Sequence, residues 1–425
     1  MNYKDKKLDV FLYKYKPGLI IWASIASFST YFCMYAFRKP YTAATYDQIE
    51  VFGLDYKEVL ILTQVIGYTI SKFIGIKFVS EVKFDQRIKF IFCLLFISWI
   101  TLFLFGTVPE QYNLILMFIN GISLGMIWGL VFSFLEGRRF TEILAASLSA
   151  SFIISSGIVK SIGLWLINLG VPDFWMPFCT ASIFIPPLFL FLWMLSKIPS
   201  PDAEDIKKRV IREPMNKSQR VKIFFKYSSV LIPLLVLHIV LTGYRDFRDK
   251  FAVDILREMG YNKPSDLIIS ETIIGLTLLI FLGSLFMIKN NQKAYKVVLV
   301  IISTGVLISG LATLLYASNG IFIQISPYIW YTFTGLGLYL AYVPFHSILF
   351  DRMIAVFKIK SNAVFFIYLA DSTGYLGSLV VLIIKTFNNR NISYLDFFIF
   401  SSYVLIFVGV ISMALTFIFS RKLQT

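Results

Sequence analysis

The first long apolar segment of the chain is GLIIWASIASFSTYFCMYAF, residues 18–37, and it is followed directly by Arg38, Lys39 and Pro40. A helix needs roughly 20 predominantly apolar residues to cross the hydrocarbon core of a bilayer, so this segment is long enough to span a membrane. Two adjacent cations at its end are costly to place in lipid. The segment therefore predicts a transmembrane helix that ends in functional charges.

The composition of the whole chain predicts an integral membrane protein. Hydrophobic residues make up 57% of the 425 positions and charged residues only 15%, with a mean hydropathy of +0.73. The predicted fold class is an all-α membrane protein with twelve transmembrane helices. The expected spans are approximately 18–40, 57–80, 88–107, 112–135, 142–169, 174–196, 229–251, 266–288, 295–317, 322–350, 361–386 and 394–420.

Lysine and arginine collect in the N-terminal segment and in the loops after even-numbered spans, whereas the first loop holds Asp47, Glu50 and Asp55. Short, positively charged loops stay in the cytoplasm. The first span is too long for a signal peptide and is expected to be retained. We therefore predict a multi-pass protein of a bacterial cytoplasmic membrane with both termini inside. The net charge of +15 reflects this orientation, so the expected partner is the lipid bilayer and not nucleic acid.

The longest polar stretch, residues 197–228, is a basic segment midway along the chain. It is predicted to be a cytoplasmic linker between a first half, 1–196, and a second half, 229–425. Span four is followed by Glu136-Gly137-Arg138 and span ten by Asp351-Arg352, which suggests duplicated halves. Over essentially its whole length, this organisation is similar to the major facilitator fold. That resemblance implies a substrate site near the membrane midplane, where the two halves meet.

Small residues predict close helix packing in span four. Gly121, Gly125 and Gly129 recur every four residues and so share one helix face, where they allow a neighbouring backbone to approach.

Ionisable residues within the spans are the strongest functional signal, because such groups usually face a cavity or a partner. The ionisable residues of the first-half spans are interpreted as entirely cationic, which predicts an anionic ligand. The set is Arg38, Lys39, Lys72, Lys77 and Lys160 in the first half, and Arg245, Asp246, Arg248, Asp249, Glu271 and Asp371 in the second.

Tyr31, Tyr35 and Arg38 follow one another at spacings of four and three, and so share a helix face. We expect this stripe to bind a substrate through hydrogen bonds and charge. Lys39 is adjacent to Arg38 and cannot face the same direction squarely. The alternative is that both cations extend to the outer lipid headgroups.

Span seven offers a counterpart in Arg245 and Arg248, which are three residues apart. One arginine from each half would form a clamp for an anion, and guanidinium groups suit phosphate because they engage two of its oxygens at once. In the alternative interpretation, Asp246 and Asp249 neutralise these arginines.

Three short motifs, Arg38-Lys39, Ser71-Lys72-Phe73 and Arg245, together resemble the organophosphate:phosphate antiporter family, the glycerol-phosphate and hexose-phosphate carriers. Residues 373–378, TGYLGS, are similar to the glycine-rich stretch of that family in span eleven. The resemblance implies that Arg38 and Arg245 bind the phosphate group and that Lys72 assists.

The chain also departs from that family. Where the glycerol-phosphate carriers have a histidine in span five, this chain has Lys160, and Arg248 is an additional cation. These differences indicate a divergent bacterial branch, so the identity of the substrate does not transfer.

The predicted function is secondary transport of a small anionic, phosphorylated metabolite by alternating access. It would operate by antiport with phosphate, or with proton coupling through Asp371 or Glu271. We expect a monomer with no enzymatic activity, cofactor or metal. The chain has no Walker A loop, and His238 and His346 lie in separate spans, where structural roles are expected.

Two other functions remain open from the sequence. The protein could be a transporter-like sensor of an organic phosphate, which binds without moving its ligand. It could also be a proton-coupled carrier of a neutral solute that uses Asp371, with structural arginines.

Overall fold

The computed structural model describes residues 15–47, 49–82, 84–135, 138, 140–201, 217–285, 288–318, 324–359, 363–388 and 392–423. The chain divides into two compact units, Met1–Val210 and Ile211–Thr425. Residues 202–216, half of the expected linker, lie outside the described residues, as does the side chain of Lys77.

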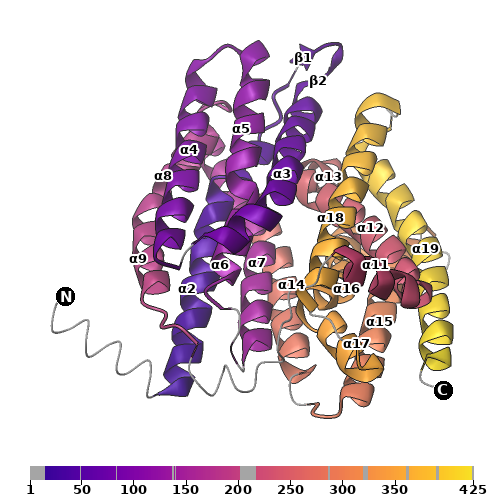
Figure 1. Cartoon of the computed structure of the whole chain (residues 1–425). Coiled ribbons are helices and arrows are strands. Elements are labelled where there is room, and N and C mark those ends of the chain that lie inside the picture. The colour runs from indigo at the N-terminus through magenta and orange to yellow at the C-terminus, as the bar shows by residue number, and fades with distance from the viewer. Residues whose placement is uncertain are drawn as a thin grey trace. The chain divides into compact units, whose positions relative to one another are not determined.

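The first unit is built from helices, with one short hairpin (Figure 1). Its elements are α2 (Lys16–Ala36), η1 (Pro40–Ala43), β1 (Glu50–Val51), β2 (Leu54–Asp55), α3 (Tyr56–Glu81), η2 (Phe84–Gln86), α4 (Arg87–Thr107), η3 (Glu110–Tyr112), α5 (Asn113–Gly125), α6 (Ile127–Phe132), α7 (Thr141–Asn168), α8 (Met176–Ile183) and α9 (Ile185–Ser196). The two strands pair antiparallel around Phe52 and Gly53, both of which have positive φ angles, as a tight hairpin turn requires.

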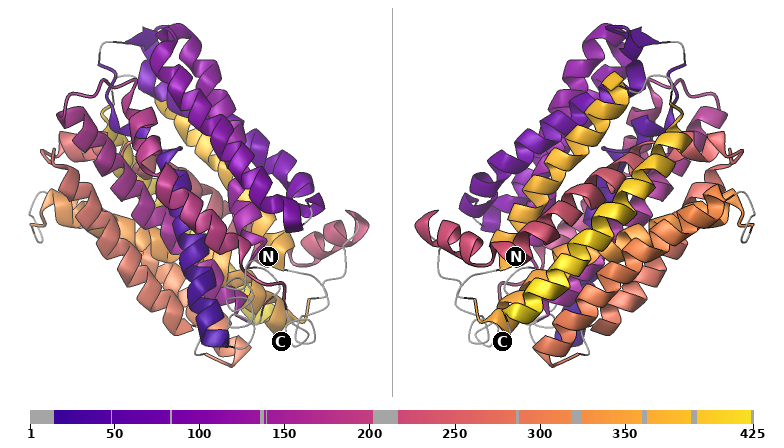
Figure 2. Two further views of the ribbon diagram at one scale, coloured as in Figure 1. Left: turned by 90° about the vertical axis from the view of Figure 1, so that its left-hand side faces the viewer. Right: turned by 90° about the vertical axis from the view of Figure 1, so that its right-hand side faces the viewer.

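The second unit is also helical. Its elements are α11 (Lys217–Lys226), α12 (Ser228–Lys250), α13 (Ala252–Glu258), α14 (Pro264–Leu285), α15 (Asn291–Ala317), α16 (Pro327–Ser347), α17 (Leu349–Phe357), α18 (Ala363–Ile383), the π-helical turn η4 (Ile384–Asn388) and α19 (Tyr394–Lys422). Figure 2 shows the long helices of each unit lying side by side.

Ten helices in the described ranges are long and apolar enough to cross a membrane. Two bent pairs supply the remaining spans: α8 and α9 meet at 45°, and α16 and α17 at 53°. Proline explains the first bend, because it lacks the N–H for a helical hydrogen bond and its ring crowds the preceding turn, and Pro186 and Pro187 open α9. The second break falls at Ile348, four residues after Pro344. The predicted twelve-span membrane fold is confirmed.

The two units repeat the same helix pairings. In the first unit α2 packs on α7 and α9, while α5 packs on α3 and α4. In the second unit α12 packs on α18 and α19, while α16 packs on α14 and α15. Corresponding spans therefore have corresponding neighbours, and the duplicated halves predicted from the sequence are present in the fold.

Glycine makes the contact between α3 and α5 possible. A Cβ atom on Gly121 would lie 2.1 Å from the carbonyl oxygen of Gln64, and one on Gly125 would lie 2.6 Å from Cβ of Ser71. The predicted packing role of these two glycines is confirmed. Gly129 lies in α6, beyond the break between α5 and α6 at Met126.

We expect Gly121→Ala to destabilise the protein by about 1–3 kcal/mol, because its methyl group must displace the α3 backbone. Thermal unfolding of the purified protein in detergent measures this. The control is Ile115→Ala, which truncates an exposed side chain of the same helix. An equal or larger loss of stability in the control variant would contradict the packing role.

Candidate functional site: a charged cluster in each unit

The cations that follow the first span lie beyond the end of α2. The sequence predicted a span reaching residue 40, but α2 ends at Ala36 and Pro40 starts η1. Pro40 has no N–H to offer to Ala36, so the helix cannot continue. The backbone N–H groups of Arg38 and Lys39 both bond to the carbonyl of Tyr35, at 3.0 and 2.9 Å.

Two buried amide side chains complete this helix end. Gln64 Nε2 donates to the carbonyl of Arg38 at 3.1 Å, and Asn120 Nδ2 lies 3.3 Å from the carbonyl of Phe37. Gln64 also donates to Asn120 Oδ1 at 2.8 Å. Carbonyls past a helix end need partners outside the helix. The backbone of Arg38 is therefore fixed by side chains of α3 and α5.

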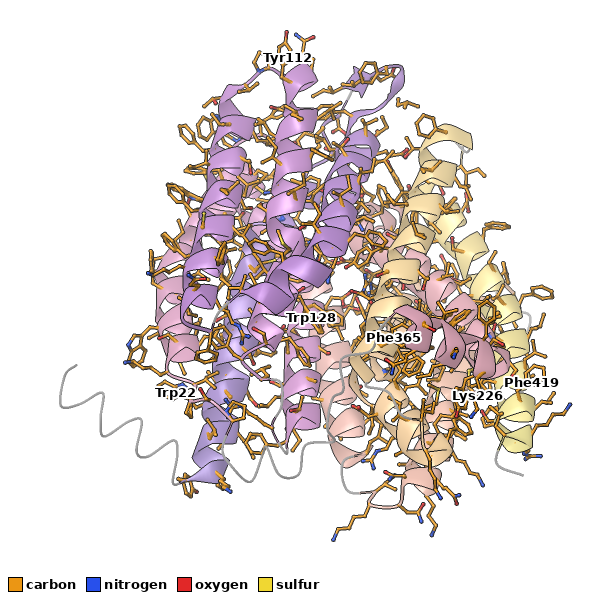
Figure 3. The ribbon with its side chains drawn as sticks, in the orientation of Figure 1. Trp22, Tyr112, Trp128, Lys226, Phe365 and Phe419 are labelled. Carbon is orange, nitrogen blue, oxygen red and sulfur yellow. The ribbon has the colours of Figure 1, made fainter. Side chains whose placement is uncertain are left out.

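The side chain of Arg38 lies over an aromatic ring that the sequence analysis missed. Its Cζ is 3.8 Å from the centre of the Tyr68 ring, and Lys72 Nζ is 5.6 Å from the same ring centre. Lys72 also lies 5.4 Å from the ring of Trp128, labelled in Figure 3. Cations are attracted to the faces of aromatic rings. Tyr68 therefore brings two of the predicted site cations together.

The predicted tyrosine stripe joins the same cluster. Tyr31 and Tyr35 pack edge to face with ring centres 5.5 Å apart. Arg38 Cζ lies 5.8 Å from the Tyr35 ring centre, and Lys39 Nζ lies 6.0 Å from it. The Tyr31 side chain also hydrogen-bonds with that of Tyr68.

Lys39 and Lys160 are both buried. Only 5% of Arg38, 2% of Lys39 and 1% of Lys160 is exposed. Lys160 lies on α7, which packs on both α2 and η1. Neither Arg38 nor Lys39 extends over an exposed surface, as the headgroup interpretation would require.

Charge in the first unit differs from the sequence interpretation, because the set is not entirely cationic. Asp55 caps α3 by accepting from the N–H of Glu58 at 2.9 Å, so this helix includes Lys57 and Glu58, both buried. The buried charged side chains among the described residues of this unit are Arg38, Lys39, Lys57, Arg138 and Lys160 on the positive side and Glu58 on the negative side. A large positive surplus remains.

Asp246 is the centre of the second cluster. Arg245 Nε lies 3.1 Å from Asp246 Oδ1, and Lys250 Nζ lies 2.7 Å from Asp246 Oδ2. The hydroxyl of Ser378, on α18, donates to the same Oδ2. This geometry agrees with the alternative in which Asp246 neutralises Arg245, although the carboxylate is shared by two cations.

Arg248 has a different partner from Arg245. Its Nη1 lies 2.7 Å from Oε1 of Glu271, both side chains are buried, and its Cζ lies 4.1 Å from the Tyr331 ring centre. Arg245 instead donates to the hydroxyl of Tyr342 and stacks on that ring. Tyr331 and Tyr342 are eleven residues apart on α16, about 16 Å along the helix axis. Arg245 and Arg248, which were predicted to share a helix face, therefore contact tyrosines at different positions along α16.

The predicted proton carriers also have different surroundings. Glu271 is held by Arg248, whereas Asp371 Oδ1 lies 3.5 Å from Nε2 of His346. His346 in turn contacts His238, with ring centres 5.1 Å apart. The contact between these histidines was not predicted from the sequence, because spacing along the chain does not show that α12 and α16 meet here.

Among the buried charged residues described in the second unit, the two signs balance. They are Arg248, Lys250 and Lys385 against Asp246, Asp254 and Glu271. The surplus of buried positive charge therefore belongs to the first unit.

A family model matches residues 40–422, which include nearly all of the elements described above. The chain belongs to the family of unknown function DUF5690. No curated protein matches its sequence.

Three solved structures are similar to this DUF5690 protein along nearly their whole length. The nucleoside transporter NupG has a TM-score of 0.57 at 16% identity, covering 93% of this chain and 98% of that one. A D-xylose-proton symporter has a TM-score of 0.63 at 14% identity, with coverages of 95% and 97%. A POT family transporter in complex with a thioalcohol-conjugated peptide has a TM-score of 0.60 at 15% identity, with coverages of 96% and 96%. At such identities the likeness shows the fold, which is the major facilitator fold.

We expect Glu271→Gln to destabilise the protein by roughly 3–5 kcal/mol, because it leaves Arg248 charged and buried without its carboxylate. Thermal unfolding in detergent measures the loss. The double variant Arg248→Gln, Glu271→Gln removes both charges and should recover most of the stability. A single variant as stable as the wild type would show that the ion pair contributes little.

Proposed function

We propose that this protein is a secondary transporter that moves a small anionic metabolite across the membrane by alternating access. The observation that supports this most strongly is the surplus of positive charge among the buried residues described in the first unit. One of these cations, Arg38, lies over the ring of Tyr68, which Lys72 also approaches. The major facilitator fold supports a transport role in general. The charge distribution supports the anionic substrate.

Burying net charge in a membrane protein is unfavourable, so such charges commonly mark the path of a substrate or ion. An anion that binds beside Arg38 would offset part of this cost. Tyr31 and Tyr35 lie close enough to add hydroxyl donors to the same ligand. A phosphate group fits the donors best, because a guanidinium can engage two of its oxygens. The resemblance to organophosphate:phosphate antiporters supports the same substrate class.

Arg245 is the proposed contribution of the second unit. Its partner Asp246 is also bound by Lys250 and Ser378, so the carboxylate remains satisfied when Arg245 turns toward a ligand. We propose that Arg38 and Arg245 are both substrate-binding residues, with Lys72 assisting and Lys39 and Lys160 adding positive potential. An anion that binds more tightly to the protein midway between its inward-open and outward-open conformations than to either conformation would speed the change from one to the other.

A proton-coupled carrier of a neutral solute is the second candidate. It is favoured by the pairing of Arg245 with Asp246 and of Arg248 with Glu271, which gives these arginines a structural role. Under this alternative Arg38 and Arg245 are dispensable for recognition.

We expect purified protein in proteoliposomes to accumulate radiolabelled glycerol 3-phosphate or inorganic phosphate, but not radiolabelled glycerol. Arg38→Gln and Arg245→Gln should each lower the initial rate at least about tenfold, because each removes a charge-assisted hydrogen bond worth roughly 1.5–3 kcal/mol. The matched control is Arg257→Gln, at an exposed arginine of α13.

Three outcomes would contradict the proposal. Uptake that is insensitive to both substitutions, or that favours neutral solutes, would support the neutral-solute carrier. Binding of phosphate esters without flux would indicate a sensor.

A further inference from the structure

The only two histidines of the chain lie against each other in the second unit. His238 is on α12 and His346 is in the last turn of α16. Tyr342 packs on both, with its ring centre 5.2 Å from that of His238 and 4.7 Å from that of His346. Residues 108 positions apart in sequence thus form one group of stacked rings.

A carboxylate from a third helix faces this pair. Asp371, on α18, places Oδ1 3.5 Å from Nε2 of His346. The side chains of His346 and Asp371 are 10% and 14% exposed, so both remain accessible, whereas His238 is fully buried. A negative charge at this distance attracts a proton to an imidazole.

His238 has unused hydrogen-bonding capacity. Neither of its ring nitrogens has a hydrogen-bond partner among the described residues. Gly374 follows Asp371 by three positions on α18, and a Cβ atom there would lie 3.2 Å from His238 Nε2. On the same face of α18, Asp371 therefore lies against His346, whereas Gly374, which has no side chain, lies against His238. Buried polar atoms without partners are rare and costly, which calls for a functional explanation.

We propose that His346, Asp371 and His238 form a proton-binding site, in which a proton from water binds His346 beside Asp371 and His238 provides a second acceptor. Chains of histidine and carboxylate side chains within the membrane commonly carry protons in transporters. This inference rests on the proposed function and identifies the proton as the ion whose movement is coupled to transport. Of the two carboxylates expected from the sequence, it selects Asp371, because Glu271 is held by Arg248.

His238 is fully buried, whereas His346 is partly exposed and lies beside Asp371, so the proton would reside on His346. The charged groups that act on His238 are His346 and Arg245, which oppose a positive charge, and Asp371, which favours one. Asp371 Oδ1 lies 3.5 Å from Nε2 of His346. Tyr342, a further titratable group, stacks on both histidines.

The same tyrosine connects the proton site to the proposed anion site. Arg245 Cζ lies 4.4 Å from the Tyr342 ring centre, and its Nη1 donates to the Tyr342 hydroxyl. An anion bound to Arg245 would offset the positive charge that repels a protonated histidine. By thermodynamic reciprocity, a bound proton would then strengthen anion binding by the same factor. This favours co-transport of proton and anion over exchange of anions.

Histidine-selective NMR tests the site directly, because all imidazole signals come from only two rings. The full chain, labelled with ¹³C,¹⁵N-histidine and held in lipid nanodiscs without substrate, is titrated with acid. His238→Gln and His346→Gln assign the signals. We expect His346 to bind the proton, and Asp371→Asn to lower its proton affinity about tenfold. Asp249→Asn, at a carboxylate of α12, is the control and should leave that affinity unchanged.

The proposal is overturned if neither histidine titrates in the wild type, or if Asp371→Asn shifts His346 no more than Asp249→Asn does. Asp371→Ser replaces Asp371→Asn should the latter fail to fold. Since the titration needs no substrate, its result is independent of the flux assay. Transport without a titrating histidine would refute this site alone, and a titrating site without transport would refute the proposed function alone.

Discussion

The end of α2 at Ala36 is the constraint on which the candidate anion site depends. Pro40 stops the helix, and the carbonyls of the buried residues Phe37 and Arg38 then need donors from other parts of the protein. Gln64 and Asn120 supply these donors from two other spans, and they are themselves joined by a hydrogen bond. The glycine contact between α3 and α5 brings the two amides within reach. A proline, two amides and two glycines thus position one arginine.

The two halves share an architecture but use charge differently. Among its described residues the first unit buries more cations than anions, with Arg38 beside aromatic rings. The buried charges described in the second unit balance, and ion pairs form at Asp246 and Glu271. Buried ion pairs add little net stability, but breaking one is costly, so such pairs hold side chains in defined positions. We interpret the first unit as the source of anion attraction. The second unit orients Arg245 and holds the histidine pair with Asp371.

Much of this fold could be predicted from the sequence, because span length, the glycine repeat and the central polar stretch each reflect a local requirement of helices in lipid. Arg38, Lys72 and the tyrosine stripe were also predicted, since charge inside a span is visible in the sequence. What could not be predicted depends on contacts between distant spans. The ring of Tyr68, the partner of Arg248 and the meeting of His238 with His346 are set by tertiary packing. Gln64 and Asn120 left only a weak signal, as polar residues within apolar runs.

The most direct test of the central claim, that the buried positive charge binds a small anion, is ligand-dependent thermal stability of the purified protein. A ligand that binds only the folded state raises the unfolding temperature, by an amount that grows with its concentration. The account predicts that glucose 6-phosphate stabilises the wild-type protein, that glucose does not, and that Arg38→Gln abolishes the effect. Equal stabilisation by the charged and the neutral sugar, or an undiminished effect in Arg38→Gln, would contradict it.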